Sequence, residues 1–372
     1  MVYLDNAATS FPKPESVIKE VEKCLSKYCG NPGRSAFGIS LDASEKIYET
    51  REKISDLFNI DDPSRIVFTQ NATHGLNIAI KGLIKEKCHI IISDLEHNSV
   101  IRPLYKVIKS FGGDFSVYNT DEDIEIEIER LLRDDTRVII STIASNVTGK
   151  IINHEKLYKK AKEKGLFLIL DASQYLGHIP FNYKNCPADC IIAPGHKALF
   201  GLQGSGVLIV GPNTLPDTLI EGGNGYNSNE ETMPYLLPER YEAGTLSTPA
   251  IVGLCEGIKF IKDIGLDAVN AKINKLSEKT LDVLNSFNDI EVYGSGMGII
   301  SFNLNGISSS KGSEILYSYD IITRPGLHCS PLVHQKLGTL LEGAIRISYS
   351  YMNELTDVDK LYKALKKIHL YK

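Results

Sequence analysis

Two residues with chemically useful side chains each follow a strongly apolar segment of the sequence. Asp171 ends the segment LFLILD, and Lys197 comes 26 residues later, directly after CIIAPGH. Asp171 alone could simply cap a following helix. A lysine behind a buried strand is costly unless its amine is paired or chemically used. Together the two residues indicate an electron-sink cofactor, which the lysine binds covalently while the acid pairs with a pyridinium nitrogen.

Cys329 is the cysteine with the most reactive surroundings. It follows His328 and lies five residues after Arg324, and cationic neighbours of this kind can lower the pKa of a thiol. A buried small hydrophobe is the common alternative for a cysteine. Cys186 and Cys190 are spaced like half a metal site, but no second pair follows them. We therefore predict buried thiols there, and no metal site.

Five short segments predict the strands that position these side chains. They are rich in Ile, Leu and Val and apolar at consecutive positions, which is typical of strands buried on both faces: 89–93, 137–142, 166–171, 190–193 and 206–210. Stretches with helical periodicity, such as 154–164, separate several of them. The order predicts an open α/β sheet, mostly parallel, with ligands at the carboxyl ends of its strands. A further helix opens at Ala72, and its N-terminus is available to an anion.

The second half of the chain predicts a smaller domain. A segment rich in Gly, Pro and Asn at 211–244 is too long for a simple connector. Helical patterning over about 250–287, short strands around 290–304 and 321–324, and a final helix follow it. We place a large domain at 16–259 and a small α+β domain at 1–15 plus 260–372. In the acidic run 121–129 isoleucines alternate with acids, which favours a solvated edge with one apolar face.

Composition excludes several classes of protein. The 372 residues carry 41 Lys and Arg against 46 Asp and Glu, so no basic field attracts nucleic acid or an anionic membrane surface. No stretch approaches the ~18 apolar residues of a membrane span, and no leader pattern opens the chain. Seven cysteines are an odd number and argue against a disulfide framework. We expect a cytoplasmic protein with reduced thiols.

Nine ordered motifs resemble one known family over nearly the whole chain. It is the class V aminotransferase family of fold-type-I pyridoxal-phosphate enzymes and, within it, the SUF-type cysteine desulfurases and selenocysteine lyases. The motifs are YLDNAAT (3–9), TQNATHGLN (69–77), EHNS (96–99), SNVTG (145–149), DASQ (171–174), GHK (195–197), YEAGT (241–245), RPGLHC (324–329) and IRIS (345–348). The resemblance implies a fold-type-I transferase that uses pyridoxal 5'-phosphate.

The resemblance implies roles for the residues around the cofactor ring. Lys197 would bind the cofactor and also move the proton of the substrate Cα, which requires a depressed pKa. Asp171 would keep the ring nitrogen protonated. His97 would lie over the ring, where the alternative reading is a histidine that only caps a helix. Gln174 would donate to the ring oxygen, with Asn146 beside it.

The resemblance also implies a phosphate site that two subunits share. The phosphate would rest on the helix N-terminus at Ala72 and Thr73, with His196 as a further donor. The family usually has a hydroxyl residue where this chain has Pro194, and His74 is a candidate to compensate. Thr245 would reach the phosphate of the partner subunit, which implies a homodimer.

The substrate is implied to be an amino acid held by its carboxylate. Arg346 is the best candidate for a bidentate clamp on this group. Arg324 and Arg34 are second candidates for the same pocket. The family usually has a histidine just before the equivalent of Arg34, where this chain has Gly33.

The reaction implied is that of a cysteine desulfurase. It converts L-cysteine to L-alanine and leaves a persulfide on Cys329 for transfer to an acceptor, which could be a protein. Alternatives are a selenocysteine lyase acting on L-selenocysteine, another class V aminotransferase-type reaction, and a non-catalytic scaffold. The glycines of GLQGSGVLIVG (201–211) suggest a nicotinamide site, but they precede a strand instead of joining a strand to a helix. After Cys329 the family has alanine and this chain has Ser330.

Overall fold

A seven-stranded sheet forms the centre of the computed structural model, which describes residues 1–33 and 37–370. Its strand order is β2-β8-β7-β6-β5-β3-β4. β8 is antiparallel to both neighbours, and the pairs from β7 to β4 are parallel. This confirms the prediction of a mostly parallel sheet. The bounds are β2 (Ile66–Thr69), β3 (Cys88–Ser93), β4 (Gly113–Tyr118), β5 (Thr136–Thr142), β6 (Phe167–Asp171), β7 (Cys190–Pro194) and β8 (Gly206–Val210).

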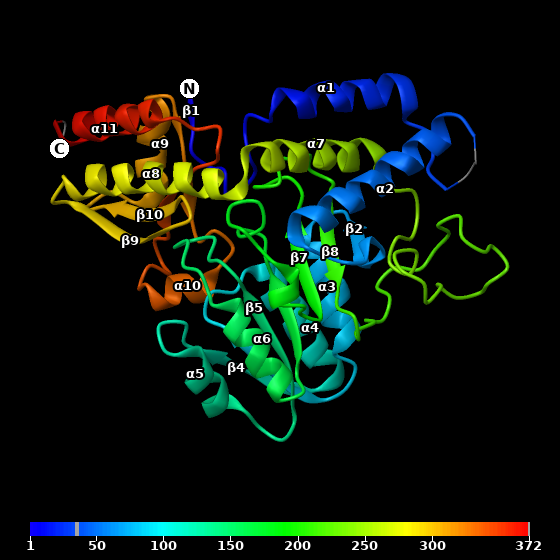
Figure 1. Ribbon diagram of the computed structural model, residues 1–372. Helices are drawn as coiled ribbons and strands as arrows, with labels where there is room; N and C mark the ends of the chain where they lie inside the picture. The colour runs from blue at the N-terminus through cyan, green and yellow to red at the C-terminus, as the bar shows by residue number, and fades with distance from the viewer. Residues whose placement is uncertain (34–36, 371–372) are drawn as a thin grey trace.

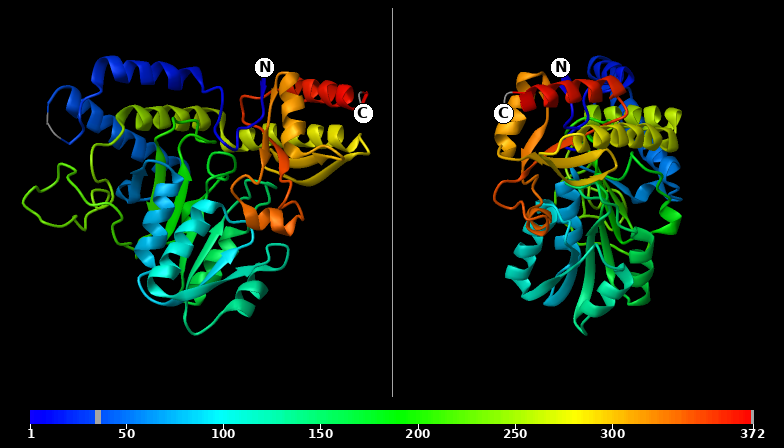
Figure 2. Two further views of the ribbon diagram at one scale, coloured as in Figure 1. Left: turned by 180° about the vertical axis from the view of Figure 1, so that it is seen from behind. Right: turned by 90° about the vertical axis from the view of Figure 1, so that its left-hand side faces the viewer.

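Helices bury both faces of this sheet (Figures 1 and 2). In β3, Ile90 and Ile92 pack with α3 (Ala72–Leu83) and α4 (Asn98–Phe111), whereas Ile91 points into the opposite core. That second core contains side chains of α2 (Ile39–Phe58), α5 (Ile124–Leu131), α6 (His154–Glu163) and α7 (Thr248–Ile264). Successive strand residues point to opposite faces, so strands covered on both sides need consecutive apolar residues.

A separate antiparallel sheet of order β12-β13-β10-β9 forms the small domain. The chain's first strand, β1 (Val2–Tyr3), pairs in parallel with β11 (Ile321–Ile322), so the N-terminus lies beside the C-terminal elements (Figure 1). The boundary between 259 and 260 stays a prediction and falls inside α7. The other elements are α8 (Leu266–Asn285), β9 (Ile290–Gly296), β10 (Ile299–Leu304), α9 (Ser309–Ser318), β12 (Arg324–Gly326), α10 (Pro331–Lys336), β13 (Ala344–Ser348) and α11 (Leu355–Leu370).

The first helix lies over α7, outside the main sheet (Figure 1). α1 (Glu15–Lys23) continues into a π-helical turn, η1 (Cys24–Tyr28), and α2 follows it. Two short 3-10 turns complete the described elements, η2 (Pro63–Arg65) before β2 and η3 (Tyr183–Asn185) before β7. Cys186 and Cys190 are both buried free thiols, as predicted.

The prediction for the acidic run 121–129 was wrong, because this segment forms the helix α5 and not an edge. The Asp123 carboxylate accepts hydrogen bonds from the backbone N–H groups of Glu125 and Ile126, which caps the helix. Ile128 is buried and Ile126 is 69% exposed. The alternation of isoleucines therefore does not define the buried face. The N-cap and the apolar pair four residues apart, Ile124 and Ile128, decide the structure.

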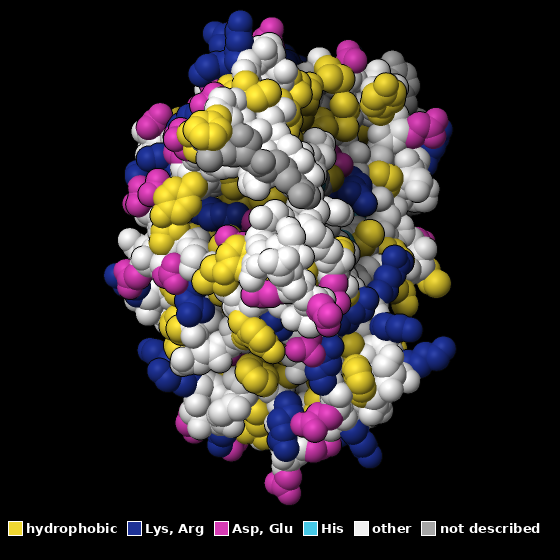
Figure 3. Space-filling view, turned by 90° about the vertical axis from the view of Figure 1, so that its right-hand side faces the viewer, with side chains coloured by type: hydrophobic (Ala, Val, Ile, Leu, Met, Phe, Trp, Pro, Cys, Tyr) yellow, Lys and Arg dark blue, Asp and Glu magenta, His cyan; other side chains and the backbone are white. Residues whose placement is uncertain are grey.

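The long segment after β8 reaches α7 without forming a helix or strand in the described chain, and it projects from the body of the molecule (Figures 1 and 2). Figure 3 looks onto the side that bears this segment and α2, where apolar side chains are scattered among charged ones. Tyr235 is 78% exposed and Leu236 54%. No helix in the described parts of the chain is long and apolar enough to cross a membrane.

Candidate active site

A pocket opens at the carboxyl ends of the parallel strands and encloses about 530 Å³ of empty space, partly open to solvent. This is the place where open α/β sheets bind ligands. Eight of the predicted site residues line it: Ala72, Thr73, His97, Asn146, Asp171, Gln174, His196 and Lys197. Residues from separate parts of the sequence therefore converge on one cavity.

Lys197 and Asp171 reach the pocket because β6 and β7 are neighbouring parallel strands. Lys197 forms no hydrogen bond or ion pair with any described residue. Burial lowers the pKa of its amine to about 8, against the opposing effect of the Asp171 carboxylate. Asp171 is 4% exposed, and its Oδ1 accepts the Ser173 N–H at 2.9 Å. In the described chain no helix directly follows Asp171 for it to cap, and its carboxylate instead holds the turn after β6 at the edge of the pocket.

His97 caps a helix and also lines the pocket. It is the N-cap residue of α4, where its Nδ1 accepts the Ser99 N–H at 3.0 Å, and its ring lines the pocket. Burial lowers the pKa of His97 to about 4, with Asp171 opposing the shift. The ring is therefore neutral at pH 7. Because Nδ1 accepts a hydrogen bond, the ring proton sits on Nε2.

The N-terminus of α3 lies at one end of the pocket and forms a cradle that could hold an anion. Ala72 and Thr73 begin this helix, and because the Asn71 side chain accepts the His74 N–H, the N–H groups of Ala72 and Thr73 are the ones left for an anion. The hydroxyl of Thr73 lies 2.8 Å from that of Ser99. The buried Nδ1 of His196 has no hydrogen-bond partner among the described residues. Thr73, Ser99 and His196 all line the pocket, and so the cradle combines hydroxyl and imidazole groups.

Pro194 removes one hydroxyl from the cradle, and His74 does not replace it. The Nδ1 of His74 accepts the Gln70 N–H at 3.3 Å, and its side chain does not line the pocket. The hydroxyl groups of Ser99 and Ser173 do line it. Ser99, beside Thr73, is therefore a candidate for the hydroxyl donor that is absent at position 194.

Arg346 is buried behind the pocket and is already paired. It is 2% exposed, and a 2.6 Å ion pair joins its Nη2 to the Asp5 carboxylate. Its Nη1 donates to the Asn146 carbonyl oxygen at 3.0 Å, and its Nε has no partner among the described residues. A substrate carboxylate would therefore share this guanidinium with Asp5. Asp5 lies in the motif YLDNAAT, but sequence reasoning gave it no role.

The other predicted substrate and phosphate residues differ in position. Arg324 faces Arg346 across the β12–β13 pairing and is half-buried. Gln174 lines the pocket, and its Nε2 donates to the Ala7 carbonyl oxygen at 3.0 Å. Thr245 is exposed and lies outside the pocket, where it accepts a 3.5 Å hydrogen bond from Asn31. Its contact with a partner subunit stays a prediction. Arg34 lies outside the described residues.

Cys329 is exposed and lies on a groove that joins the mouth of the pocket. It lines this groove together with Thr73, His97 and Ser99. Its carbonyl oxygen accepts the Asn98 N–H at 2.7 Å, so the cysteine turn satisfies a free donor at the N-terminus of α4. The expectation of a cationic His328 beside the thiol was wrong. Burial lowers the pKa of His328 to about 3, so the imidazole is neutral at pH 7.

Glu96 is a titratable residue next to the site that sequence reasoning missed. It is fully buried, and its Oε1 accepts the Thr142 N–H at 2.8 Å. Burial raises the pKa of its carboxyl group to about 8. Only its position within EHNS, after the strand end, could have drawn attention to it.

Glu96→Gln should change the dependence of stability on pH. Between pH 5 and 8 the folded chain keeps a proton on Glu96 that the unfolded chain has already released, so this residue lowers stability as pH rises through that window. The glutamine variant lacks this loss. Its stability relative to the wild type should rise by up to about 1.4 kcal/mol per pH unit. Urea unfolding at pH 5.5 and 7.5 measures it, with the exposed Glu122→Gln as control. An equal difference at both pH values would contradict the assignment.

Comparison with known proteins assigns the chain to a class. The sequence profile described as aminotransferase class-V matches residues 2–361, and the chain belongs to this family. The relatives that it resembles include a probable cysteine desulfurase of Pyrococcus abyssi, 30% identical over 99% of this chain and 94% of the relative. Another is a probable cysteine desulfurase of Methanothermobacter thermautotrophicus, 29% identical over 99% and 94%.

The fold of the chain also resembles that of a solved structure. The apo structure of a cysteine desulfurase from Thermococcus onnurineus superposes with a TM-score of 0.91 and is 29% identical. The match covers 99% of this chain and 94% of that one. The predicted fold class is thereby confirmed: a fold-type-I transferase with a mostly parallel large sheet and a smaller α+β part.

Proposed function

We propose that this protein is a pyridoxal-phosphate-dependent cysteine desulfurase that converts L-cysteine to L-alanine and forms a persulfide on Cys329. The observation that carries the proposal is the placement of this exposed thiol on a groove that shares Thr73, His97 and Ser99 with the pocket containing Lys197 and Asp171. The names of the relatives, cysteine desulfurases over nearly their full length, support it.

The residues of the pocket fit pyridoxal phosphate. A half-buried lysine without a partner among the described residues can bind its aldehyde carbon, and the α3 cradle with the unpartnered His196 Nδ1 can accept its phosphate. Asp171 can hold the pyridine nitrogen protonated. When bound, the cofactor withdraws electrons from the substrate Cα and weakens its C–H bond.

Lys197 and Cys329 then divide the chemistry between them. With a pKa of about 8, Lys197 is partly deprotonated near neutral pH and can remove the Cα proton. The Cys329 thiolate attacks the substrate sulfur, which forms an S–S bond and breaks the C–S bond. The electron pair of the broken bond stays with the carbon skeleton, which takes up protons and leaves as alanine. The persulfide on the exposed Cys329 can then pass its sulfur to an acceptor.

Arg346 is the residue for the substrate carboxylate, with Arg324 beside it. The Asp5 carboxylate keeps the guanidinium in one orientation before substrate arrives. The exposed position of Thr245 supports a homodimer in which this residue serves the partner's phosphate. The exposed apolar side chains of the projecting segment, such as Tyr235, also support an interface between two copies.

An assay with two substrates tests this function. Purified protein loaded with pyridoxal phosphate should release alanine from L-cysteine, and mass spectrometry should then find one added sulfur on Cys329. L-selenocysteine is run in parallel. Turnover of selenocysteine with no turnover of cysteine would replace the proposal by a selenocysteine lyase, and amino-group transfer to a keto acid would replace it by an aminotransferase.

A further inference from the structure

The turn that carries Cys329 has an unfavourable backbone conformation. His328 and Cys329 both have positive φ angles, 51° and 59°. Two consecutive non-glycine residues in the left-handed region are rare, because Cβ crowds the following carbonyl group. Such a conformation persists only where surrounding contacts determine it. The contacts around this turn therefore decide where the thiol lies.

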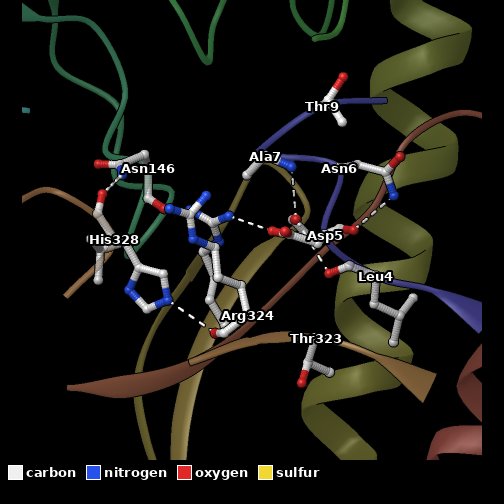
Figure 4. A network of polar contacts seen from close by, with 12 residues as sticks. Leu4, Asp5, Asn6, Ala7, Thr9, Asn146, Thr323, Arg324 and His328 are labelled. Carbon is white, nitrogen blue, oxygen red and sulfur yellow. Dashed lines mark hydrogen bonds and ion pairs between the residues drawn. The ribbon is translucent and has the colours of Figure 1, made fainter. Parts of the chain in front are cut away.

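Backbone contacts hold the turn on two sides. Asn146 Nδ2 donates to the His328 carbonyl oxygen at 2.7 Å (Figure 4), and the Asn98 N–H donates to the Cys329 carbonyl oxygen at the same distance. The Ser330 N–H closes the turn onto the Leu327 carbonyl oxygen at 2.9 Å. These contacts fix the backbone but leave the His328 ring to be held by other groups.

A chain of hydrogen bonds runs beneath the turn through two histidine rings. His328 Nε2 lies 3.1 Å from the Arg324 carbonyl oxygen, and His328 Nδ1 lies 3.2 Å from His334 Nε2. His334 Nδ1 in turn lies 2.8 Å from the Thr339 hydroxyl. The two rings stack with centroids 5.4 Å apart, and His334 is fully buried. These hydrogen bonds join α10 and Thr339, three residues beyond its end, to β12, the strand that carries Arg324.

The chemistry of the groups fixes the direction of every bond in this chain. A carbonyl oxygen only accepts, so His328 Nε2 carries the proton. In a neutral ring Nδ1 is then an acceptor, and it requires the Nε2–H of His334. His334 Nδ1 must accept from the Thr339 hydroxyl. Burial lowers the pKa of His328 to about 3 and that of His334 to about 4, in agreement with two neutral rings.

We propose that His334 is a positioning residue for Cys329, which acts by holding the His328 ring and thereby the left-handed turn that bears the thiol. The inference rests on the proposed role of Cys329 as the sulfur-accepting nucleophile. His334 itself is buried and does not line the pocket or the groove, so it contacts neither substrate nor cofactor. The donor at its Nε2 is the group that matters, because no other described group reaches His328 Nδ1 within hydrogen-bonding distance.

Two substitutions at position 334 separate this role from simple filling of space. His334→Leu removes the donor and leaves a buried ring nitrogen without a partner. His334→Gln can place an amide N–H near the position of Nε2 and should therefore keep most of the wild-type protection of the turn. Thr339→Val keeps the side-chain shape but removes the hydroxyl that donates to His334. It should reduce the protection of the turn less than His334→Leu does, and it can still be measured if the leucine variant does not fold. Gln335→Leu, an exposed neighbour on α10, is the matched control.

The first measurement is hydrogen exchange of the Ser330 and Asn98 amides in protein without cofactor. The leucine variant should exchange both amides at least tenfold faster than the wild type. The glutamine and control variants should exchange them at rates close to those of the wild type. Retained protection in the leucine variant would overturn the proposal. Because this readout needs no turnover, it tests the positioning role even if the proposed desulfurase activity fails.

The second measurement separates two steps in the loaded enzyme. The leucine variant should lose at least tenfold in kcat for alanine formation from cysteine, while exchange of the Cα proton of L-alanine with solvent continues at the wild-type rate. Equal loss in both reactions would show a general defect of the pocket and overturn the proposal. Faster amide exchange with unchanged kcat would also overturn it. A wild type that turns over no cysteine would instead reject the proposed function.

Discussion

Cys329→Ala is expected to reduce alanine formation from L-cysteine by at least the ~10²-fold typical of removing a catalytic group. Without the Cys329 thiol, no other described residue that lines the groove offers a thiol to take the sulfur as the C–S bond breaks. Selenium is a softer centre that can leave without this nucleophile, so turnover of L-selenocysteine should persist in part. Alanine release from both substrates measures the effect, and the bound cofactor's absorbance confirms that the pocket is intact.

The chain offers its own control for this experiment. Cys29 is the other exposed free cysteine among the described residues, and Cys29→Ala should leave cysteine turnover unchanged. Mass spectrometry after treatment with cysteine should find the added sulfur on Cys329. Undiminished turnover by Cys329→Ala, or a persulfide found on Cys186 or Cys190 alone, would reject the proposed mechanism.

Lys197→Ala should remove both the covalent link to the cofactor and proton transfer at Cα. Exchange of the Cα proton of L-alanine with solvent should fall by ~10² to 10⁴-fold, the range for loss of a general base. In the wild type, borohydride reduction should fix the cofactor on Lys197, and in the variant it should leave no reduced adduct. Exchange measured by NMR and peptide mapping by mass spectrometry give the two readouts.

Lys13 is the second lysine on which the peptide mapping could find the reduced cofactor. Burial lowers the pKa of its amine to about 8 as well, and the amine donates to the His196 carbonyl oxygen at 2.9 Å, next to Lys197 in the sequence. An adduct on Lys13 would mean that the wrong lysine was assigned. Lys109→Ala, an exposed position on α4, serves as the control and should retain both the adduct and the exchange rate.

The central strands could be predicted because burial on both faces leaves a local signal. Consecutive Ile, Leu and Val in β3, β5, β6, β7 and β8 pack alternately into the two hydrophobic cores on opposite faces of the sheet. β4 was not predicted, because it lies at the sheet edge and its side chains are mostly half-buried or exposed. β2 is only four residues long, too short for periodicity to distinguish it. The antiparallel direction of β8 has no sequence signal of its own.

The site was predicted where a motif and a strand end coincide, as for Asp171 and Lys197. Pairings across long sequence separations could not be predicted. Asp5 and Arg346 are 341 residues apart and meet only because β1 joins the small domain beside β13. The charge state of His328 was also out of reach, because the burial that lowers its pKa comes from the folded chain around it, including the α10 histidine that stacks on its ring.

Asn146 makes three regions of the chain interdependent. Its amide nitrogen holds the His328 carbonyl group, its amide oxygen accepts the Ser330 hydroxyl at 2.7 Å, and its backbone oxygen receives Arg346. The His328 carbonyl can only accept, so the orientation of the amide is fixed and its oxygen must face residue 330.

Residues that share a partner in this way do not contribute independently to free energy. Among relatives of this chain, the effect of having serine or alanine at position 330 should therefore depend on the residue at position 146. Engineering that grafts the turn around Cys329 into another family member should transfer both positions together.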